Sequence, residues 1–159
     1  MKVLIYGYGN PGRQDDGLGD AFVNRIRQWV AIEGLHDFCF DSNYQLNIED
    51  AEAISGMDLV IFVDASKEDI DDFCLTKVDG TSELSFTSHA ASPGYIVKLC
   101  GELFNKKPLA LLLHIKGYEW EFMEGISEKA DENLNNALIY MKKRLLHPEK
   151  FLKSKLKFW

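Results

Sequence analysis

Two carboxylates and one imidazole are the side chains of this 159-residue sequence that could act together in chemistry. Asp16 belongs to an acidic pair after a glycine-rich turn, Asp64 follows a wholly apolar run, and His89 ends a polar stretch. Carboxylate oxygens and an imidazole nitrogen suit a divalent metal of intermediate softness, such as Ni²⁺, Zn²⁺ or Mn²⁺. Three protein ligands would leave coordination positions open for a substrate. Asp16, Asp64 and His89 therefore form a candidate metal site.

Each of these positions also has a simpler structural interpretation. Asp15 could cap the helix that follows it, and Asp16 could stabilise the positive end of the same helix. Asp64 could accept hydrogen bonds from the turn after its strand, and His89 could cap a loop. The sequence leaves these structural roles open beside the metal site.

The turn before the acidic pair also matches a weak nucleotide-binding pattern. Gly7, Gly9 and Gly12 follow the first predicted strand with the spacing of a dinucleotide fingerprint. Asp41 could then serve as the ribose-binding acid. The fingerprint delivers a pyrophosphate to the start of a helix, where two aspartates would repel it. A cation is therefore the more favourable ligand at this turn. A nucleotide-binding α/β module stays as an alternative.

The composition indicates one globular domain, which we place at 1–146, followed by a basic tail at 147–159. A hydrophobic content of 46% allows a sizeable core, and the net charge of −7 argues against nucleic-acid binding. We expect no membrane partner and a cytoplasmic location, because the sequence has no signal-peptide pattern and no apolar run of about 18 residues. The three scattered cysteines argue against a disulfide framework.

Apolar runs and helix signals alternate along the chain. The pattern predicts strands at 3–6, 37–41, 59–63, 73–78 and 109–115, and helices at 16–33 and after Asn47, Ser92 and Ser127. Continuous apolar runs are typical of central strands that are covered on both faces. The loop before 73–78 is too short for a parallel crossover, so this strand should be antiparallel and near an edge. These elements predict a three-layer, mostly parallel α/β fold.

Such a sheet can bring the candidate residues together. Ligands of open α/β sheets bind at the carboxyl ends of the strands, where the strand order reverses. If the second and third strands flank the first, Asp16 and Asp64 both lie at that point, and a loop from the reversed strand could deliver His89. We expect His114, inside a predicted buried strand, to be a core residue. We interpret 147–159 as a partly frayed tail, with docking on an acidic partner or membrane surface as the alternative.

The chain resembles the [NiFe]-hydrogenase maturation endopeptidases. The resemblance rests on the motifs GYGNPGRQDDGLG (7–19), YQL (44–46), DLVIFVDAS (58–66), SHAASP (88–93) and HIKGYEWEFMEGIS (114–127). These motifs spread in order along most of the chain, and the first is the most specific. The resemblance implies a twisted five-stranded sheet in three layers with one antiparallel strand.

The resemblance also implies an activity. The family removes a C-terminal extension from a hydrogenase large-subunit precursor after nickel insertion, and it is sometimes classed with aspartic peptidases. Its metal-contacting positions match Asp16, Asp64 and His89, with the two aspartates as catalytic carboxylates. Nickel would arrive with the precursor, although other divalent metals could substitute for it. We expect a monomer whose partner is the precursor, and a non-catalytic hydrogenase-assembly chaperone is the alternative.

Overall fold

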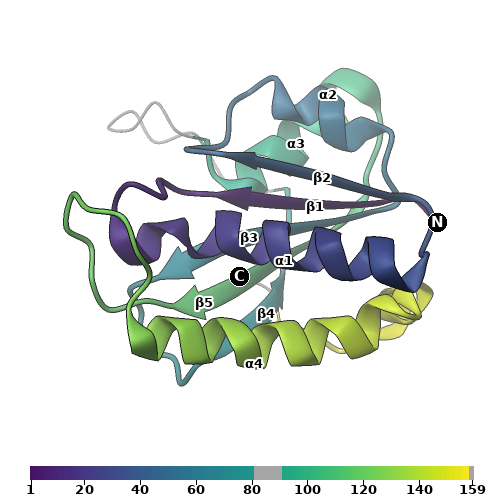
Figure 1. The fold of residues 1–159 in the computed structure, drawn as a ribbon. Helices are drawn as coiled ribbons and strands as arrows, with labels where there is room; N and C mark the ends of the chain where they lie inside the picture. Colours follow the sequence, from purple (N-terminus) through teal and green to yellow (C-terminus); the bar gives the residue numbers. More distant parts are fainter. Residues whose placement is uncertain (81–90, 158–159) are drawn as a thin grey trace.

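A computed structural model describes residues 1–80 and 91–157, which fold around one five-stranded sheet (Figure 1). The strands are β1 (Val3–Tyr8), β2 (Phe38–Asn43), β3 (Leu59–Ser66), β4 (Phe73–Lys77) and β5 (Leu109–Lys116). Their order across the sheet is β2-β1-β3-β5-β4, and β4 pairs antiparallel with β5 while the other pairs are parallel. The predicted mostly parallel sheet with one reversed edge strand is confirmed.

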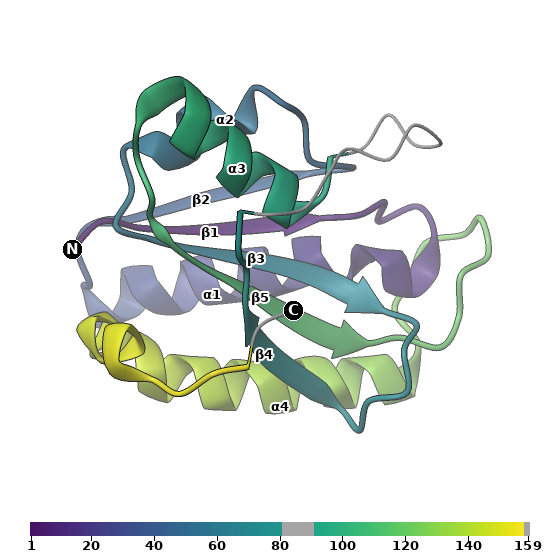
Figure 2. The ribbon, with the colours of Figure 1, turned by 180° about the vertical axis from the view of Figure 1, so that it is seen from behind.

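Helices cover both faces of this sheet. Figures 1 and 2 show α1 (Leu18–Glu33) and α4 (Glu128–Leu145) on one face, with α2 (Asp50–Ser55) and α3 (Pro93–Phe104) on the other. Two short 3-10 helices are η1 (Gln14–Gly17) and η2 (Pro148–Lys153). The predicted three-layer α/β/α architecture is therefore confirmed. Across the described part of the chain, no helix has the length and apolar character needed to cross a membrane.

The central strand β3 supplies side chains to two separate cores. Ile61 and Val63 pack in the core under α1 and α4, whereas Val60 and Phe62 pack in the core under α2 and α3. All four are fully buried, and burying each contributes about 1.5–3 kcal/mol. Successive side chains of a strand point to opposite faces, so a strand that is covered on both faces must be apolar throughout. This requirement explains the continuous apolar run of β3.

A close approach between α1 and the sheet sets the position of the acidic turn. A Cβ at Gly19 would lie 2.5 Å from the carbonyl oxygen of Val63 and 2.8 Å from that of Tyr8. Because no side chain fits there, glycine lets the start of α1 lie against the ends of β1 and β3. The first turn of the helix layer thus meets the carboxyl edge of the sheet.

Several predicted element ends are confirmed by their capping contacts. The Ser92 side chain accepts the N–H of Tyr95 at 3.1 Å at the start of α3, and Ser127 accepts that of Ala130 at 3.4 Å at the start of α4. Gly34 ends α1 in the left-handed conformation that glycine favours. Capping residues whose partners lie within a few residues can be recognised from the sequence.

Other predicted boundaries are wrong by a few residues. α1 begins at Leu18 because 3-10 helix η1 precedes it, and β2 occupies Phe38–Asn43. α2 begins at Asp50 and is not capped by Asn47. Instead, the Asp50 carboxylate accepts the N–H of Asn47 at 2.8 Å and the hydroxyl of Tyr6 at 2.9 Å. This buried contact with β1 fixes where the helix starts.

The basic C-terminal segment is not frayed over its described residues. Phe151 is 1% exposed and packs in the core shared by α1 and α4. Farther along, the carbonyl oxygen of Lys157 accepts the N–H of Lys77 at 2.7 Å at the outer edge of β4. The segment therefore covers part of an edge strand that would otherwise present unpaired backbone groups.

Candidate functional site

Asp16 lies in the turn that joins β1 to α1. Its carboxylate accepts the N–H of Asn10 at 2.7 Å, and the Asn10 side chain accepts the N–H of Gly12 at 2.9 Å. Gly9 has a φ of +127°, and a Cβ there would overlap the carbonyl oxygen of Asp16. Glycine alone tolerates this conformation at so close an approach. The turn therefore folds tightly around Asp16 and leaves its side chain partly exposed.

These hydrogen bonds argue against the nucleotide-binding alternative. A pyrophosphate needs free backbone N–H groups in the glycine turn. Here the N–H groups of Asn10 and Gly12 are bonded to side-chain oxygens, and that of Gly9 donates to two backbone oxygens at the end of β2, at 3.0 and 3.1 Å. The carboxylate of Asp16 thus takes one of the donors that a phosphate would use, and its negative charge favours a cation at this turn.

Asp15 has a different role from the helix cap considered above. Gly17 is the N-cap of α1 without a side-chain cap, and Asp15 is fully buried. The Asp15 carboxylate accepts the N–H groups of Tyr118, Glu119 and Ser127 at 2.7, 2.9 and 2.7 Å, and the Ser127 hydroxyl at 2.8 Å. Burial acts to raise the pKa of Asp15, but these hydrogen bonds outweigh it and lower the pKa. Asp15 joins the acidic turn to the loop before α4.

Asp64 lies within β3 and not after its end, because the strand continues to Ser66. Its carboxyl accepts hydrogen bonds from the Tyr8 hydroxyl and the Ala65 N–H. Burial and, to a smaller extent, the negative charge of Asp16 raise the pKa of Asp64 to about 7, against the lowering effect of both hydrogen bonds. The two aspartates are therefore close enough for one charge to change the protonation of the other carboxyl.

A row of polar side chains continues from Asp64 across the sheet. His114 on β5 is in register with Asp64, and Cys74 on β4 is in register with His114, so the three lie on one face. His114 is 4% exposed, which confirms the predicted core position, and its Nε2 lies 2.9 Å from the Thr76 hydroxyl. Burial lowers the pKa of His114 to about 4, so the imidazole is neutral near pH 7.

The third predicted ligand, His89, lies outside the described residues. Among residues 1–80 and 91–157, no group of three or more histidine, cysteine, aspartate or glutamate side chains could hold a metal ion. The structure thus brings Asp16 and Asp64 together at the carboxyl edge of β1 and β3, and the three-residue metal site stays a prediction. Two oxygen donors at one edge could contribute to binding a divalent ion but would need further ligands.

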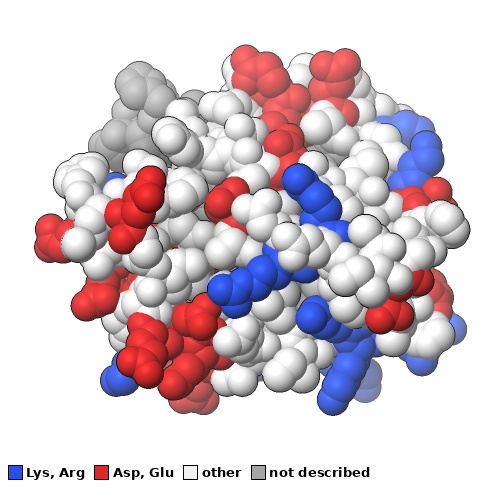
Figure 3. All heavy atoms as spheres, in the orientation of Figure 1, with Lys and Arg blue, Asp and Glu red and all other residues white. Residues whose placement is uncertain are grey.

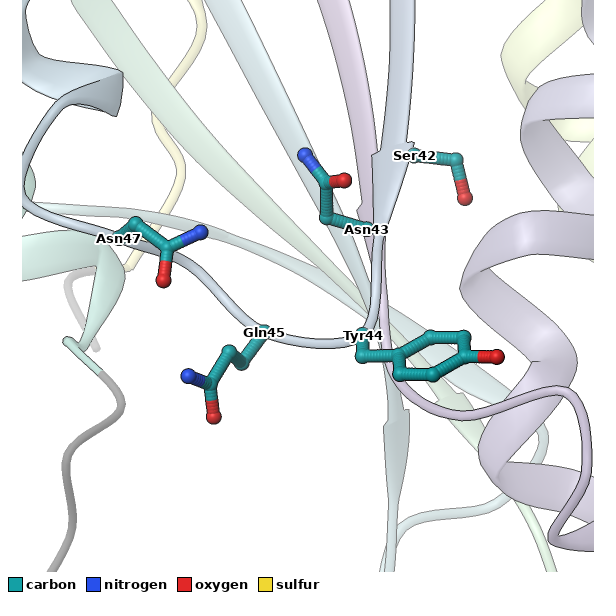
Figure 4. Close-up of a pocket in the computed structure, with 5 residues that line it drawn as sticks. All are labelled: Ser42, Asn43, Tyr44, Gln45 and Asn47. Carbon is teal, nitrogen blue, oxygen red and sulfur yellow. The ribbon is translucent and has the colours of Figure 1, made fainter.

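A hollow of about 590 Å³ lies at the end of β2, on one side of the acidic turn (Figure 4). Its lining residues are Ser42, Asn43, Tyr44, Gln45 and Asn47. Figure 4 shows the ring of Tyr44 and the amide of Gln45 pointing in different directions from the chain, and Tyr44 is 73% exposed. Three of its five lining side chains are amides, which both donate and accept hydrogen bonds, and the Asn43 amide donates to the Tyr6 hydroxyl at 2.7 Å.

The loop 117–127 lies on the other side of the acidic turn, beside the start of α1 in Figure 1. Arg13 donates a hydrogen bond to the carbonyl oxygen of Trp120 at 3.3 Å, and its guanidinium lies 4.5 Å from the ring centre of Phe122. The ammonium of Lys67 lies 4.7 Å from the ring centre of Trp120. The paired carboxylates therefore lie between an amide-lined hollow and an aromatic loop.

The sequence identified Asp16 and Asp64, and it marked the motifs at 44–46 and 114–127, but it did not predict that these two segments flank the aspartates. The acidic pair is visible because it follows a glycine turn, and Asp64 because it interrupts an apolar run. The hollow has no signal in residue types alone. The anchoring of the loop by Asp15 spans more than a hundred residues, with separations of 103, 104 and 112. A buried carboxylate with so distant a set of partners cannot be recognised from local spacing.

No family model and no curated protein matches the chain. Solved structures share its fold. A structure described as hydrogenase maturating endopeptidase HybD from E. coli has a TM-score of 0.74 and 15% identity, over 93% of this chain and 94% of that one.

Two further solved structures are also maturation proteases. The [NiFe] hydrogenase maturation protease HycI from Thermococcus kodakarensis has a TM-score of 0.71 and 19% identity, over 92% of this chain and 93% of that one. A hydrogenase 2 maturation peptidase from a Thaumarchaeota archaeon has a TM-score of 0.64 and 17% identity, over 91% and 98%. The fold implied by the sequence resemblance is thus confirmed along nearly the whole chain.

Proposed function

We propose that this chain is an endopeptidase that removes a C-terminal extension from a nickel-loaded [NiFe]-hydrogenase large-subunit precursor. The observation that carries the proposal is the interacting pair Asp16 and Asp64 at the carboxyl edge of the sheet. The pair lies in a fold shared with solved structures that are described as hydrogenase maturation proteases. Neither the fold nor the pair alone would define this function.

Nickel is the part of the substrate that Asp16, Asp64 and His89 are proposed to recognise. Carboxylate and imidazole ligands suit this ion, and other divalent ions with the same ligand preference would compete for the site. An incomplete set of protein ligands accepts a metal that arrives with ligands of its own. A precursor without nickel would lack this attachment, so the enzyme would select the loaded precursor.

The aspartates are also the proposed catalytic groups. A carboxylate that lies beside the scissile peptide bond can accept a proton from the attacking water and return it to the leaving amine. The Asp16–Asp64 pair resembles other interacting carboxylates in that the charge of one raises the pKa of the other. The proposal therefore includes an aspartic-type reaction. It also includes the expectation that the enzyme is a cytoplasmic monomer.

Substitution of the two aspartates tests the proposal with purified nickel-loaded precursor. We expect Asp16→Asn and Asp64→Asn to lower the rate of precursor cleavage by about a hundredfold or more, because a group that transfers protons contributes on that scale. Asp58→Asn is the matched control. Asp58 is exposed and directly precedes β3, at the amino end of the strand and therefore away from Asp16 and Asp64. Circular dichroism and thermal unfolding should show that all variants are folded.

The same assay separates the alternatives. Cleavage at the wild-type rate by both active-site variants would contradict the proposed roles of the aspartates. Stable binding of the precursor by the wild-type chain, without any cleavage, would instead indicate the assembly chaperone. His89→Ala should abolish selection of the nickel-loaded over the nickel-free precursor if His89 contributes to metal recognition.

A further inference from the structure

The loop 117–127 presents large apolar side chains to solvent next to the paired aspartates. Phe122 is 81% exposed and Met123 is 56% exposed. The guanidinium of Arg13 contacts the ring of Phe122 at 4.5 Å but leaves most of this side chain uncovered. Adjacent exposed apolar side chains of this size, rimmed by polar residues, are typical of interaction sites.

The backbone of this loop is held in place at several points. The N–H of Gln14 donates to the carbonyl oxygen of Met123 at 2.9 Å, and the N–H of Glu121 donates to the Gln14 side chain at 2.9 Å. At the base of the loop, the buried Asp15 carboxylate accepts the hydrogen bonds described above. A surface that is ordered before binding loses less conformational entropy when a partner binds.

Acidic residues surround the apolar tip. Glu119, Glu121 and Glu124 are all exposed, whereas the nearby cations, Arg13, Lys67 and Lys129, lie over aromatic rings of the same loop. Figure 3 shows acidic side chains gathered at the left of the face, where Figure 1 places this loop and the start of α4. A partner that binds here should therefore carry positive charge next to an apolar side chain.

We propose that the apolar tip of loop 117–127 docks an apolar and basic segment of the precursor polypeptide next to the scissile bond. This proposal rests on the proposed function. Continuity with the candidate site supports the precursor as the occupant, because one turn, 13–16, contacts the loop and also carries Asp16. The loop then determines which polypeptide is held in front of the aspartates, and its residues take no part in the chemical step.

Removal of the apolar side chain gives the first test, with steady-state cleavage of the nickel-loaded precursor as the measurement. We expect Phe122→Ser to raise KM about tenfold and to leave kcat within about twofold of wild type, because aromatic anchors dominate binding surfaces. Ile32→Ser is the matched control, since Ile32 is 83% exposed on α1, away from the loop. It should leave both constants unchanged.

Neutralising the acidic residues gives the second test. We expect the double variant Glu121→Gln and Glu124→Gln to raise KM at low salt and to flatten the dependence of KM on salt concentration. Glu33→Gln, an exposed glutamate at the end of α1, is the charge control and should keep the wild-type salt dependence.

The outcomes separate this proposal from the proposed function. If the wild type cleaves the precursor and the loop variants retain its KM, the docking proposal is wrong while the proposed function stands. If the wild type does not cleave, the proposed function fails, and precursor binding measured by fluorescence anisotropy decides docking: weaker binding by Phe122→Ser but not Ile32→Ser supports it, and equal binding overturns it. A Phe122-dependent dimer in light scattering, with unchanged KM, would assign the tip to a second copy and overturn the proposal.

Discussion

At the scale of single residues, folding places a carboxyl where its ionised form is disfavoured. Burial and the charge of Asp16 raise the pKa of Asp64 to about 7, whereas an aspartate in an unfolded chain has a pKa near 4. The native state therefore keeps a proton on Asp64 between about pH 4 and 7, after the unfolded state has lost it. Groups arranged in this way reduce stability and are concentrated at functional sites.

This arrangement predicts how stability depends on pH. As pH rises from about 4 to 7, the stability contributed by protonated Asp64 is lost, because the unfolded state releases its proton first. Asp64→Asn cannot ionise, so it should become more stable than wild type by about 2 kcal/mol at pH 8, a value reduced from the full shift because the side chain is partly exposed.

Urea unfolding of the metal-free proteins at several pH values measures this difference. His114 titrates in the same range but contributes equally to both proteins, so the difference curve isolates Asp64. Variant and wild type of equal stability at pH 8 would show that burial does not disfavour the charged carboxyl. Asp71→Asn provides a control for loss of a negative charge at an exposed position.

The residues of the candidate site differ in how far the sequence reveals them. Asp16 was predicted from a glycine turn and Asp64 from the end of an apolar run. The topology of parallel sheets brings such positions to one edge. His89 was predicted from its place before the helix at Ser92, and that prediction is untested. The role of Asp15 was not predicted, because its partners lie on a loop and helix start far along the chain.

At the scale of elements, Asp15 connects the first turn of the helix layer with the loop before α4. We expect Asp15→Asn to lower the free energy of unfolding by about 2–4 kcal/mol, because an amide nitrogen would face N–H donors and leave buried groups unsatisfied. Hydrogen exchange should show faster exchange at the Tyr118, Glu119 and Ser127 amides.

A second aspartate separates this effect from loss of charge alone. Asp131 on α4 forms an exposed ion pair with Arg25 at 2.8 Å, with side chains 44% and 43% exposed, and Asp131→Asn should change stability by less than about 1 kcal/mol. Unchanged exchange at the three loop amides in Asp15→Asn would contradict the role assigned to Asp15. The elements themselves were predictable, and the errors lie in ends set by tertiary contacts, as at Asp50.

At the scale of the whole molecule, two apolar cores on either face of the sheet explain why the fold was predictable. The alternation of apolar runs and amphipathic helices fixes the layers, and the short loop before β4 indicates its reversed direction. The contribution of the C-terminal segment was not predicted. Apolar side chains interleaved with lysines resemble a solvated tail, and only the tertiary structure shows that Phe151 fills a position in the core.

The core contact of Phe151 can be tested by substitution. Phe151→Ala should lower the free energy of unfolding by about 3–5 kcal/mol, because it removes a buried aromatic ring and leaves a cavity among α1, α4 and the sheet. Its neighbour Leu152 is 61% exposed, so Leu152→Ala is the matched control and should change the same quantity by less than about 0.5 kcal/mol. Urea unfolding followed by tryptophan fluorescence measures both variants. Equal stabilities would mean that the C-terminal segment lies on the domain without supporting its core, and the fold would then depend on residues before Pro148 alone.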